Sequence, residues 1–198
     1  MRTSSLAALV PLTLLLLSPA LSAAPFTLTQ WTAAAGGNNH FYYVFERDDF
    51  INWTDASLAA QSFGGYLATI TSAEENAFVT ALTQTPSGPL ESWIGFTDAL
   101  LEGDFQWVTG ETVNYSNWAV GEPNDDPRFA GEDYAIINPP PEPAGTWNDL
   151  PNDPNRVRAF VIEFEQVPSD IPEPATFWTL TAAAGALLLF TRRRRRVV

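Results

Sequence analysis

The chain of 198 residues contains no cysteine and no lysine, and it has a single histidine. The absence of cysteine excludes disulfide bonds, thiolate zinc sites, iron–sulfur clusters and a cysteine nucleophile. The absence of lysine excludes a Schiff-base lysine and the lysine of a phosphate-binding loop. One histidine disfavours zinc, copper and non-haem iron sites, and we expect His40 to be solvated because it follows a polar Gly-Gly-Asn-Asn turn.

Basic residues are also scarce in the body of the chain. Residues 25–170 hold 22 acidic residues and four arginines, a net charge of −18, whereas the other six arginines stand at Arg2 and at 192–196. A body this acidic repels nucleic acid and anionic lipid, so we expect no nucleic-acid partner. It suits a protein that binds divalent cations or that is kept soluble by its charge.

The first 24 residues have the pattern of a secretory signal. Arg2 precedes an apolar run at 6–17, and small residues follow at 20 and at 22–24, where a signal peptidase cuts. The apolar run is too short for a membrane span. We therefore expect a signal peptide over residues 1–24, cut within about 22–25, and an exported protein.

The C-terminal region, 169–198, has three parts: a Pro-Glu-Pro sequence at 172–174, an uncharged stretch at 175–191 and five arginines at 192–196. A helix over the uncharged stretch is about 26 Å long, close to the thickness of a hydrocarbon core, and the arginines place its end in the cytoplasm. A plain C-terminal anchor explains the helix and the arginines but not the Pro-Glu-Pro.

This order of parts resembles the PEP-CTERM sorting tail of Gram-negative bacteria. The resemblance implies transient anchoring in the inner membrane through residues 175–191 and cleavage near the Pro-Glu-Pro by an exosortase-type enzyme. The protein is then released to the cell exterior or attached at the cell surface, often alongside exopolysaccharide, as in a biofilm.

Between these ends, residues 25–168 are predicted to form one α+β domain. Helical spacing of apolar residues with a glycine pair as a stop predicts a helix over 53–63, and Ser72 followed by Glu75 is typical of the start of a second helix that continues to about 82. Aromatic and β-favouring segments predict strands at 41–45, 93–96, 105–108 and 160–164.

Residues 109–156 are rich in Asn, Asp, Pro and Gly and are predicted to be a long loop region with a function. Carboxylate and amide side chains cluster in it at 122–126, 132–133 and 148–149. Calcium takes six to eight oxygen ligands of these kinds, and it would remove the repulsion between them. A solvated acidic surface has the same composition, so composition alone leaves both interpretations open.

The order and intervals of several motifs across residues 31–166 resemble the C-type lectin domain. The matching segments are 53–56, 64–76, 93–98, 102–107, 115–118, 122–124, 131–133 and 147–149. The resemblance implies a looped fold with two helices, antiparallel sheets and a long calcium-binding loop. The tryptophans in these segments are expected to belong to the core rather than to stack on sugars; they are Trp93, Trp107, Trp118 and Trp147.

In sugar-binding members of this family, a calcium ion on the long loop also binds two neighbouring sugar hydroxyls. Carried over to this chain, the resemblance implies that one set of side chains binds calcium and sugar together: Glu122, Asn124, Glu132, Asn148 and Asp149. Asp149 would add its backbone carbonyl. The Glu-Pro-Asn order at 122–124 is associated with mannose, glucose, N-acetylglucosamine and fucose rather than galactose, and we expect its Glu–Pro bond to be cis.

The resemblance also implies a second, auxiliary calcium site, made of Asp98, Glu102, Asp125, Glu132 and Asp133. The loop between Asn124 and Glu132 is slightly longer than is usual in the family. It includes Phe129, whose ring either stacks on a sugar face or packs within the loop.

The missing cysteines are the plainest departure from the family pattern. The two usual bridges fall at Ala60 with Ile162 and at Tyr134 with Asn152. Packing of the apolar first pair replaces its bridge, whose loss costs about 2–5 kcal/mol in small domains. The second pair offers no obvious substitute, so we expect calcium to order the long loop.

These observations favour a non-catalytic, calcium-dependent carbohydrate-binding domain, displayed at the cell surface or associated with exopolysaccharide, whose partner is a polysaccharide. The alternative is a domain of the same fold that binds protein or has a structural role in a matrix. A glycosidase that uses two of the carboxylates is disfavoured, because nothing in the sequence singles out an acid with a raised pKa.

Overall fold

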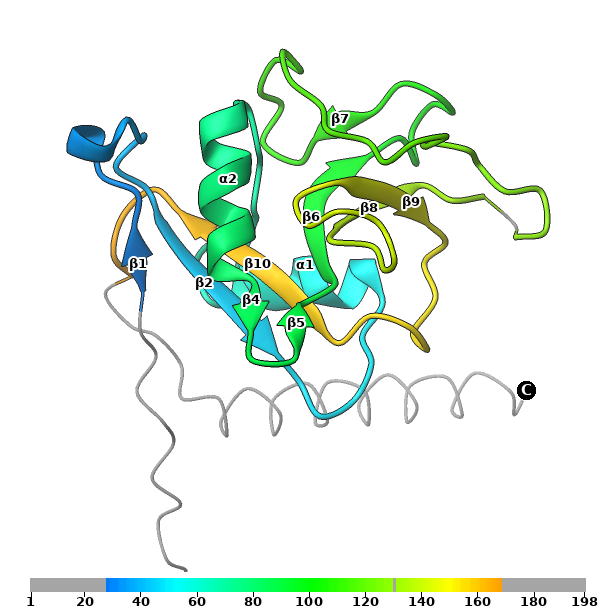
Figure 1. Ribbon diagram of the computed structural model, residues 1–198, viewed down its shortest axis with the longest axis horizontal. Coiled ribbons are helices and arrows are strands. Elements are labelled where there is room, and N and C mark those ends of the chain that lie inside the picture. Colours follow the sequence, from blue (N-terminus) through cyan, green and yellow to red (C-terminus); the bar gives the residue numbers. More distant parts are fainter. Residues whose placement is uncertain (1–27, 130, 169–198) are drawn as a thin grey trace, which may run out of the picture. The chain divides into compact units, whose positions relative to one another are not determined.

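A computed structural model of the chain describes residues 28–129 and 131–168 (Figure 1). The predicted signal peptide at 1–24 and the predicted sorting tail at 169–198 lie outside these residues. In the described part, no helix has the length and apolar character needed to cross a membrane. The membrane helix predicted over 175–191 lies in the part that is not described.

The described chain folds into two helices and two β-sheets, which confirms the predicted α+β class. The helices are α1 (Trp53–Ser62) and α2 (Ala73–Leu82), preceded by a 3-10 turn at Ala33–Ala35. The main sheet contains β1 (Thr29–Gln30), β2 (Phe41–Glu46), β3 (Tyr66–Leu67), β6 (Ser92–Thr97), β7 (Gln106–Trp107), β8 (Tyr134–Ile137), β9 (Trp147–Leu150) and β10 (Ala159–Phe164). A separate hairpin contains β4 (Gln84–Thr85) and β5 (Gly88–Pro89).

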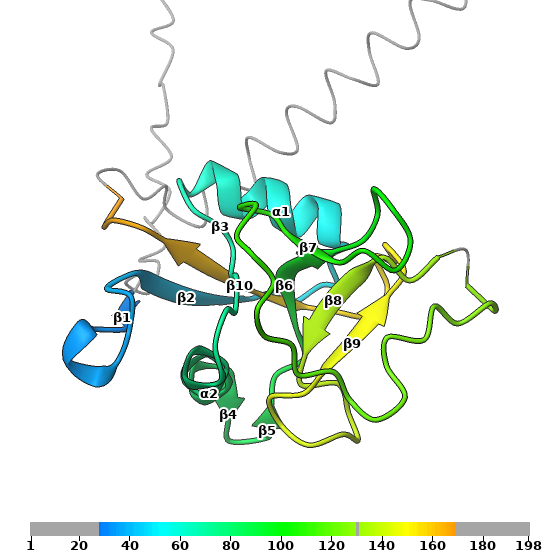
Figure 2. The same ribbon diagram turned by 90° about the horizontal axis from the view of Figure 1, so that it is seen from above.

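Strand β10 joins the two halves of the main sheet, whose order is β1-β2-β10-β6-β8-β9. It pairs antiparallel with β2 over its whole length and parallel with β6. Figure 2 shows β1 and β2 at one end of this arrangement and β8 and β9 at the other, with α1 and α2 on opposite sides of the β2–β10 pair. Strand β2, near the start of the domain, therefore pairs directly with β10 at its end, and β6 connects this pair to β8 and β9.

The predicted strands at 41–45, 93–96, 105–108 and 160–164 are confirmed as β2, β6, β7 and β10. Most of the predicted loop region at 109–156 is loop, but Tyr134–Ile137 and Trp147–Leu150 form β8 and β9. These strands are four residues long and stand among Asn, Asp, Gly and Pro, so the composition of the region hid them. Burial explains them, because nearly all their residues are shielded from solvent by β6 and the core.

Both predicted helices are confirmed, and each begins at a side-chain cap. The side chain of Asn52 accepts from the Asp55 N–H at 2.7 Å, and that of Ser72 accepts from the Glu75 N–H at 3.1 Å. Such caps satisfy N–H groups that have no partner within the helix. Helix α1 stops where Gly64 takes a φ of +83°, a backbone conformation that favours glycine.

An aromatic core fills the space beneath the β6, β8 and β9 end of the sheet. Trp107 and Trp147 are buried in this cluster, and Trp118 packs partly buried against it. Trp93 is also fully buried, so the expected core role of all four tryptophans is confirmed. The ring of Phe96 stacks on Trp107 with centroids 4.2 Å apart. These rings pack beneath the loops that leave β7 and β9.

Both positions of the first missing disulfide are buried, which agrees with the packing expected there. Ala60 on α1 and Ile162 on β10 are both fully buried. Next to them, Gly65 has no room for a side chain, because a Cβ there would lie 2.5 Å from the Glu163 carbonyl oxygen and 2.8 Å from an Ile162 methyl group. Close packing of small residues thus joins the start of β3 to β10 without a covalent link.

The expectation that nothing replaces the second disulfide is wrong. The Tyr134 ring lies 4.7 Å from the Trp53 ring, centroid to centroid. Asn152 donates from its amide to the Thr54 hydroxyl at 2.8 Å and accepts from the Thr54 N–H at 3.2 Å. Both positions are therefore attached to the first turn of α1 instead of to each other.

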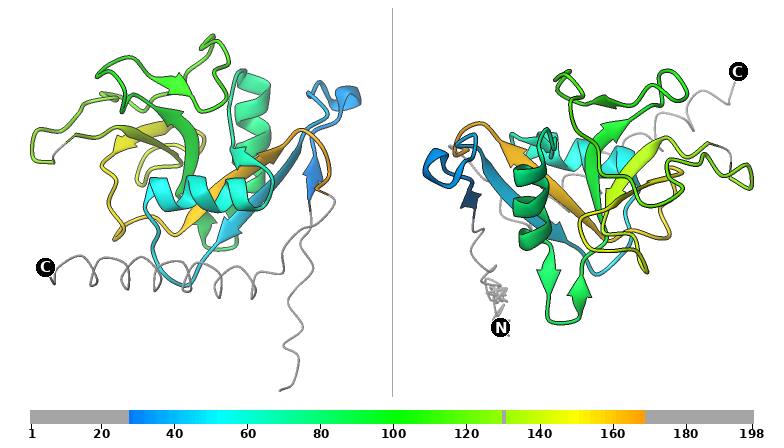
Figure 3. Two further views of the ribbon diagram at one scale, coloured as in Figure 1. Left: turned by 180° about the vertical axis from the view of Figure 1, so that it is seen from behind. Right: turned by 45° about the horizontal axis from the view of Figure 1, so that its top comes forward.

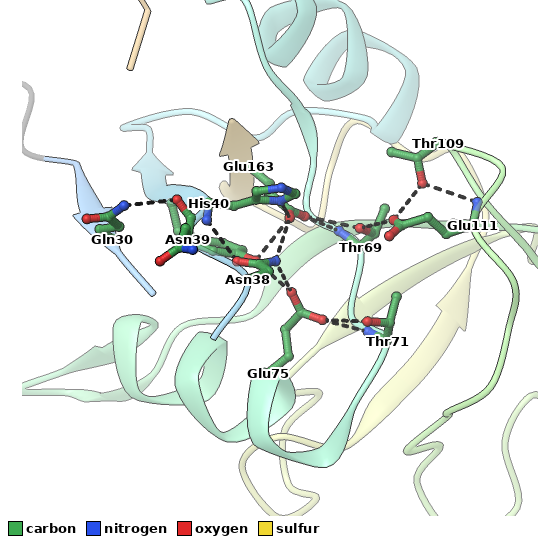
Figure 4. Close-up of polar contacts among 11 residues, drawn as sticks. Gln30, Asn38, Asn39, His40, Thr69, Thr71, Glu75, Thr109, Glu111 and Glu163 are labelled. Carbon is green, nitrogen blue, oxygen red and sulfur yellow. Dashed lines mark hydrogen bonds and ion pairs between the residues drawn. The ribbon is translucent and has the colours of Figure 1, made fainter. Parts of the chain in front are cut away.

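A buried polar network joins β2, α2 and β10 (Figure 4). The Tyr42 hydroxyl donates to Glu75 Oε1 at 2.6 Å and lies 3.0 Å from Glu163 Oε1. The His40 Nδ1 also lies 2.7 Å from Glu163 Oε1, and the His40 side chain is only 28% exposed. The expectation that His40 is solvated is therefore wrong, because its partner comes from the far end of the sequence.

The second oxygen of each buried carboxylate is satisfied by a threonine. Glu163 Oε2 accepts from the Thr69 N–H at 2.9 Å, and Glu75 Oε2 accepts from the Thr71 N–H at 2.8 Å. Burial raises the pKa of Glu163, and hydrogen bonds from His40 and Thr69 act against that rise. Without these donors, two buried carboxylates would destabilise the junction of α2 with the sheet.

Removing the Tyr42 hydroxyl tests this network. Tyr42→Phe removes the hydroxyl that donates to the buried carboxylates of Glu75 and Glu163. We therefore expect the free energy of unfolding to fall by about 2 kcal/mol. Urea denaturation measures the change. Tyr115→Phe is the matched control, because the Tyr115 hydroxyl is not part of the network; an equal loss in both variants would contradict the role of Tyr42.

Candidate functional site

The five predicted primary ligands lie on the long segment that links β7 to β8 and on β9. That segment projects from the end of the domain opposite β1 (Figures 1 and 3). Its base is fixed to β9, because the Ala119 N–H donates to the Trp147 carbonyl at 2.8 Å and the Trp147 N–H donates to the Asn117 carbonyl at 2.8 Å. This pairing places residues 122–126 beside residues 148–149.

Three of the five predicted primary ligands meet where the loop passes β9. The Asn124 side-chain amide donates to the Glu122 carboxylate. The Asp149 carboxylate accepts from the backbone N–H of Asn124 at 3.1 Å and from that of Asp125 at 2.9 Å. The Glu122–Pro123 bond is cis, as predicted.

Glu132 approaches the same group from the other end of the loop. Its Oε2 accepts from the Asp126 N–H at 2.9 Å, and its own N–H donates to Asp125 Oδ1 at 3.1 Å. The loop therefore folds back on itself between 125 and 132. This fold-back brings the Glu132 carboxylate within electrostatic reach of Glu122 and Asp149.

Asn148 is the fifth predicted ligand, and its side chain lies next to the backbone carbonyl of Asp149. The Asn148 amide nitrogen donates to that carbonyl at 2.8 Å. The side chain and the carbonyl that the family resemblance assigns to calcium are thus neighbours. A rotation of the amide would present both oxygens in the same direction.

Carboxylates crowd one another in this group. Burial, a hydrogen bond to Asp149 and the charges of Asp149 and Glu132 raise the pKa of Glu122 to about 7. Burial and then the charge of Asp149 also raise the pKa of Glu132, while the charge of Arg156 acts in the opposite direction. In the absence of a cation, these side chains therefore favour the uptake of protons.

The residues predicted for a second calcium site also come together. Asp98 is 2% exposed, and its Oδ2 accepts from the Gly103 N–H at 2.9 Å. Its Oδ1 is buried and has no hydrogen-bond partner among the described residues. Desolvation and then the charges of Asp98, Asp125 and Asp133 raise the pKa of Glu102, which places all four carboxylates in one group.

The chemistry of both groups fits calcium. The donors are carboxylate, amide and carbonyl oxygens, burial and neighbouring acids raise the pKa values of Glu122 and Glu132, and Asp98 Oδ1 has no partner in the described part of the chain. Within 28–129 and 131–168, no three histidine or carboxylate side chains are arranged to hold a metal ion as they stand. Asp149, Glu132 and Asp98 bond loop N–H groups instead, so calcium would have to replace some of these bonds.

The sequence interpretation missed the role of Asp126 in shaping the loop. Its N–H binds Glu132, and its carboxylate pairs with Arg128, whose Nε lies 2.9 Å from Asp126 Oδ1. The hydrogen bonds from Arg128 lower the pKa of Asp126 to about 2. The i, i+2 spacing of an acid and an arginine around Pro127 is the signal that indicates such a turn.

The stability of the metal-free protein should depend on pH in a way set by Glu122. Its folded-state pKa of about 7 lies above its usual 4.5, so the folded chain binds more protons than the unfolded chain between these values. The free energy of unfolding in chelator should therefore fall as pH rises from about 4.5 to 7. Chemical denaturation across that range measures this slope.

Two variants make the pH experiment specific. Glu122→Gln should flatten the slope, whereas Glu142→Gln, at an exposed acid away from the loop, should leave it unchanged. A slope that is the same in wild type and Glu122→Gln would contradict the assignment.

Comparison with known proteins agrees with this arrangement. The family model described as the lectin C-type domain matches residues 50–157, a range that contains every predicted ligand. A perlucin-like protein of Mytilus galloprovincialis is 36% identical over 111 residues, which cover 54% of this chain and 67% of that protein. Lectin BRA-3 of Megabalanus rosa is 35% identical over 113 residues, which cover 56% and 64%.

The low affinity immunoglobulin epsilon Fc receptor of Homo sapiens is 39% identical over 97 residues, which cover 49% of this chain and only 27% of the receptor. These relatives are eukaryotic, so they do not support the bacterial origin that the tail resemblance implies. The match therefore spans only a small part of the receptor's length.

Solved structures share the fold. The C-type carbohydrate-recognition domain of cow CD23, in the presence of a GlcNAc2Man3 oligosaccharide, is 30% identical with a TM-score of 0.54 and covers 64% of this chain and 88% of that one. The carbohydrate-recognition domain of the mouse scavenger receptor C-type lectin is 28% identical with a TM-score of 0.56 and covers 75% and 100%. A calcium-independent type II antifreeze protein, 22% identical with a TM-score of 0.54 over 71% and 92%, shares the fold alone.

The fold expected from the sequence motifs is therefore confirmed by the architecture and by its structural neighbours. Proteins of this family are non-enzymatic binding proteins, which agrees with the expectation of a domain without catalytic activity. The family match covers more than half of the chain and includes the long loop and β9. The chain belongs to the C-type lectin domain family.

Proposed function

We propose that this domain binds carbohydrate through a calcium ion held by the long loop and β9. The proposed ligands of both calcium and sugar are Glu122, Asn124, Glu132, Asn148 and Asp149. The observation that carries the proposal is the meeting of Glu122, Glu132 and Asp149 in one partly buried group, in which burial first, and then the hydrogen bond to Asp149 and the charges of Asp149 and Glu132, raise the pKa of Glu122 to about 7. A divalent cation would reduce the repulsion between these carboxylates and would stabilise the loop with the three side chains close together.

The side chains of the site suit sugar hydroxyls because they come as acid and amide pairs. When bound, calcium supplies the positive charge that orients two hydroxyl oxygens. Glu122 and Asn124 are already in hydrogen-bond contact, so a hydroxyl between them donates to the carboxylate and accepts from the amide. Glu132 and Asn148 are proposed to form the equivalent pair for the second hydroxyl.

The proposed ligands are sugars of the mannose, glucose, N-acetylglucosamine and fucose type. The Glu-Pro-Asn order at 122–124 supports this class. The cow CD23 domain, which was solved in the presence of an oligosaccharide of N-acetylglucosamine and mannose, adds support from a relative that is 30% identical. A polysaccharide is the natural multivalent partner for such a site, because a single sugar site binds weakly.

We also propose that Asp98, Glu102, Asp125 and Asp133 bind a second calcium ion. The unpartnered and buried Asp98 Oδ1 supports this site, since a buried carboxylate oxygen without a donor is costly. Asp125 links the two sites, because it accepts from the Glu132 N–H and its charge raises the pKa of Glu102. A cation here would hold the loop in the shape that the first site needs.

The remaining parts of the chain suggest where the domain acts. We propose a signal peptide at 1–24, the binding domain at 25–168 and a sorting tail at 169–198 that is anchored transiently through 175–191 and processed by an exosortase-type enzyme. The order of the Pro-Glu-Pro, the uncharged stretch and the arginines supports this proposal. The binding domain would then act at the cell surface or outside the cell, with exopolysaccharide as its partner.

A second candidate function is the binding of a protein, with calcium stiffening the loop. The likeness to the low affinity immunoglobulin epsilon Fc receptor favours it, because that relative is named as a receptor for an immunoglobulin, which is a protein. Glycan binding that survives only in calcium separates the two functions.

A glycan array with calcium and again with chelator tests sugar binding. We expect binding only with calcium. Asn124→Asp should weaken glycan binding by about tenfold or more, or change which sugars bind, because the aspartate replaces an amide donor by a second carboxylate. Asn114→Asp is the matched control at an exposed asparagine on the same connection. Binding that is unaffected by chelator would contradict the proposal.

Trypsin tests whether calcium orders the loop. The chain has no lysine, and Arg128 stands on the loop with its side chain 81% exposed. We expect calcium to slow cleavage after Arg128 by about tenfold or more, because the loop must open locally to enter a protease. Cleavage after Arg47, directly after β2, is the internal control, and equal protection of Arg128 with calcium and with chelator would count against the proposal.

A further inference from the structure

A small cavity opens beside Glu132, on the side of the loop that faces the end of β9. Its volume is about 50 Å³, and its lining includes Trp93, Phe129, Leu150, Pro151 and Arg156. Glu132 is its only lining residue among the predicted calcium ligands. The cavity therefore adjoins the proposed sugar site without belonging to it.

The walls of the cavity are mostly carbon. Trp93 is fully buried, and its indole N–H already donates to the Ile51 carbonyl at 2.8 Å. Leu150 forms part of the same wall and is almost completely buried. Phe129 stands at the side of the loop and is 49% exposed, although it is a large apolar residue. A small apolar group that entered the cavity would cover part of this ring.

One polar side chain supplies donors. Arg156 directs Nε and Nη2 to Glu91 Oε1, at 3.2 Å and 2.9 Å. A guanidinium carries five N–H donors, so this pair leaves donors for a ligand. The Arg156 side chain is 45% exposed, and its charge acts on Glu132. A hydrogen-bond acceptor in the cavity would thus find a partner close to the calcium site.

The charge around the cavity decides which acceptor fits. Glu132 and Asp153 line it, and Glu91 already neutralises Arg156. A carboxylate or sulfate would meet these acids, and the apolar wall gives no compensation for a charge. A neutral group with one carbonyl acceptor and one methyl matches both the donors and the wall. A volume of about 50 Å³ has room for a group of that size.

We propose that this cavity takes the acetamido group of an N-acetylated amino sugar whose hydroxyls bind the calcium. The carbonyl oxygen accepts from Arg156, and the methyl group packs between Phe129 and Leu150. This inference rests on the proposed function and adds to it a preference for N-acetylhexosamine over the parent hexose. Burial of one methyl group and one hydrogen bond together give an expected preference of about tenfold.

Titration of the full chain in calcium with N-acetylglucosamine, glucose and glucosamine tests the preference. We expect N-acetylglucosamine to bind about tenfold more tightly than glucose. Phe129→Ala, which removes the outer wall, and Arg156→Lys, which keeps the charge beside Glu91, should each bring that ratio close to one. Leu58→Ala, at an exposed leucine on α1, is the matched control and should leave the ratio unchanged.

The outcomes separate this inference from the proposed function. Calcium-dependent binding with equal affinity for the three sugars, or a ratio unchanged in Phe129→Ala, overturns the cavity assignment and leaves the calcium site standing. Tighter binding of glucosamine than of N-acetylglucosamine also overturns it, in favour of a site for a cation. Absence of calcium-dependent binding to any sugar overturns both. Thermal unfolding midpoints close to that of the wild type establish that the variants are folded.

Discussion

Carboxylates that are partly buried and close together resist ionisation, because desolvation and mutual repulsion both raise their pKa values, and the loop end of this domain contains such a group. Glu122 and Glu132 come from the two ends of a loop, and Asp149 comes from β9. Backbone pairing of Ala119 with Trp147 attaches the base of the loop to that strand. The fold itself therefore maintains the crowding, and the loop N–H groups that bond Asp149 and Glu132 lessen it only in part.

The rest of the fold explains how a chain without disulfides withstands that crowding. Strand β10 pairs with β2 and β6, and the aromatic rings around Phe96 form a continuous packed floor below β8 and β9. The polar network of Tyr42, Glu75 and Glu163 fixes α2 to the same sheet. Contacts of Tyr134 and Asn152 with the first turn of α1 hold the base of the loop region. Several non-covalent contacts thus stabilise the positions at which the family resemblance implies two disulfide bonds.

Much of this could be predicted from the sequence because it depends on local patterns. Helix caps such as Ser72, alternating aromatic strands and the spacing of loop oxygens all lie within short stretches. Features that depend on distant partners could not be predicted. His40 looked solvated because Glu163 is 123 residues away, β8 and β9 were hidden in a polar composition, and the cavity next to Phe129 exists only once Arg156 is brought beside it.

The register of the outer strands has a consequence for how the domain is presented. Gln30 pairs with Phe41, and Phe41 pairs with Phe164, so the chain enters and leaves the domain at neighbouring points of the sheet. The long loop projects from the opposite end (Figure 3). A tether attached at either terminus would therefore join the domain at the end of the sheet opposite the long loop, and the loop would point away from the point of attachment. Many copies fixed to one surface in this way would all face the same medium.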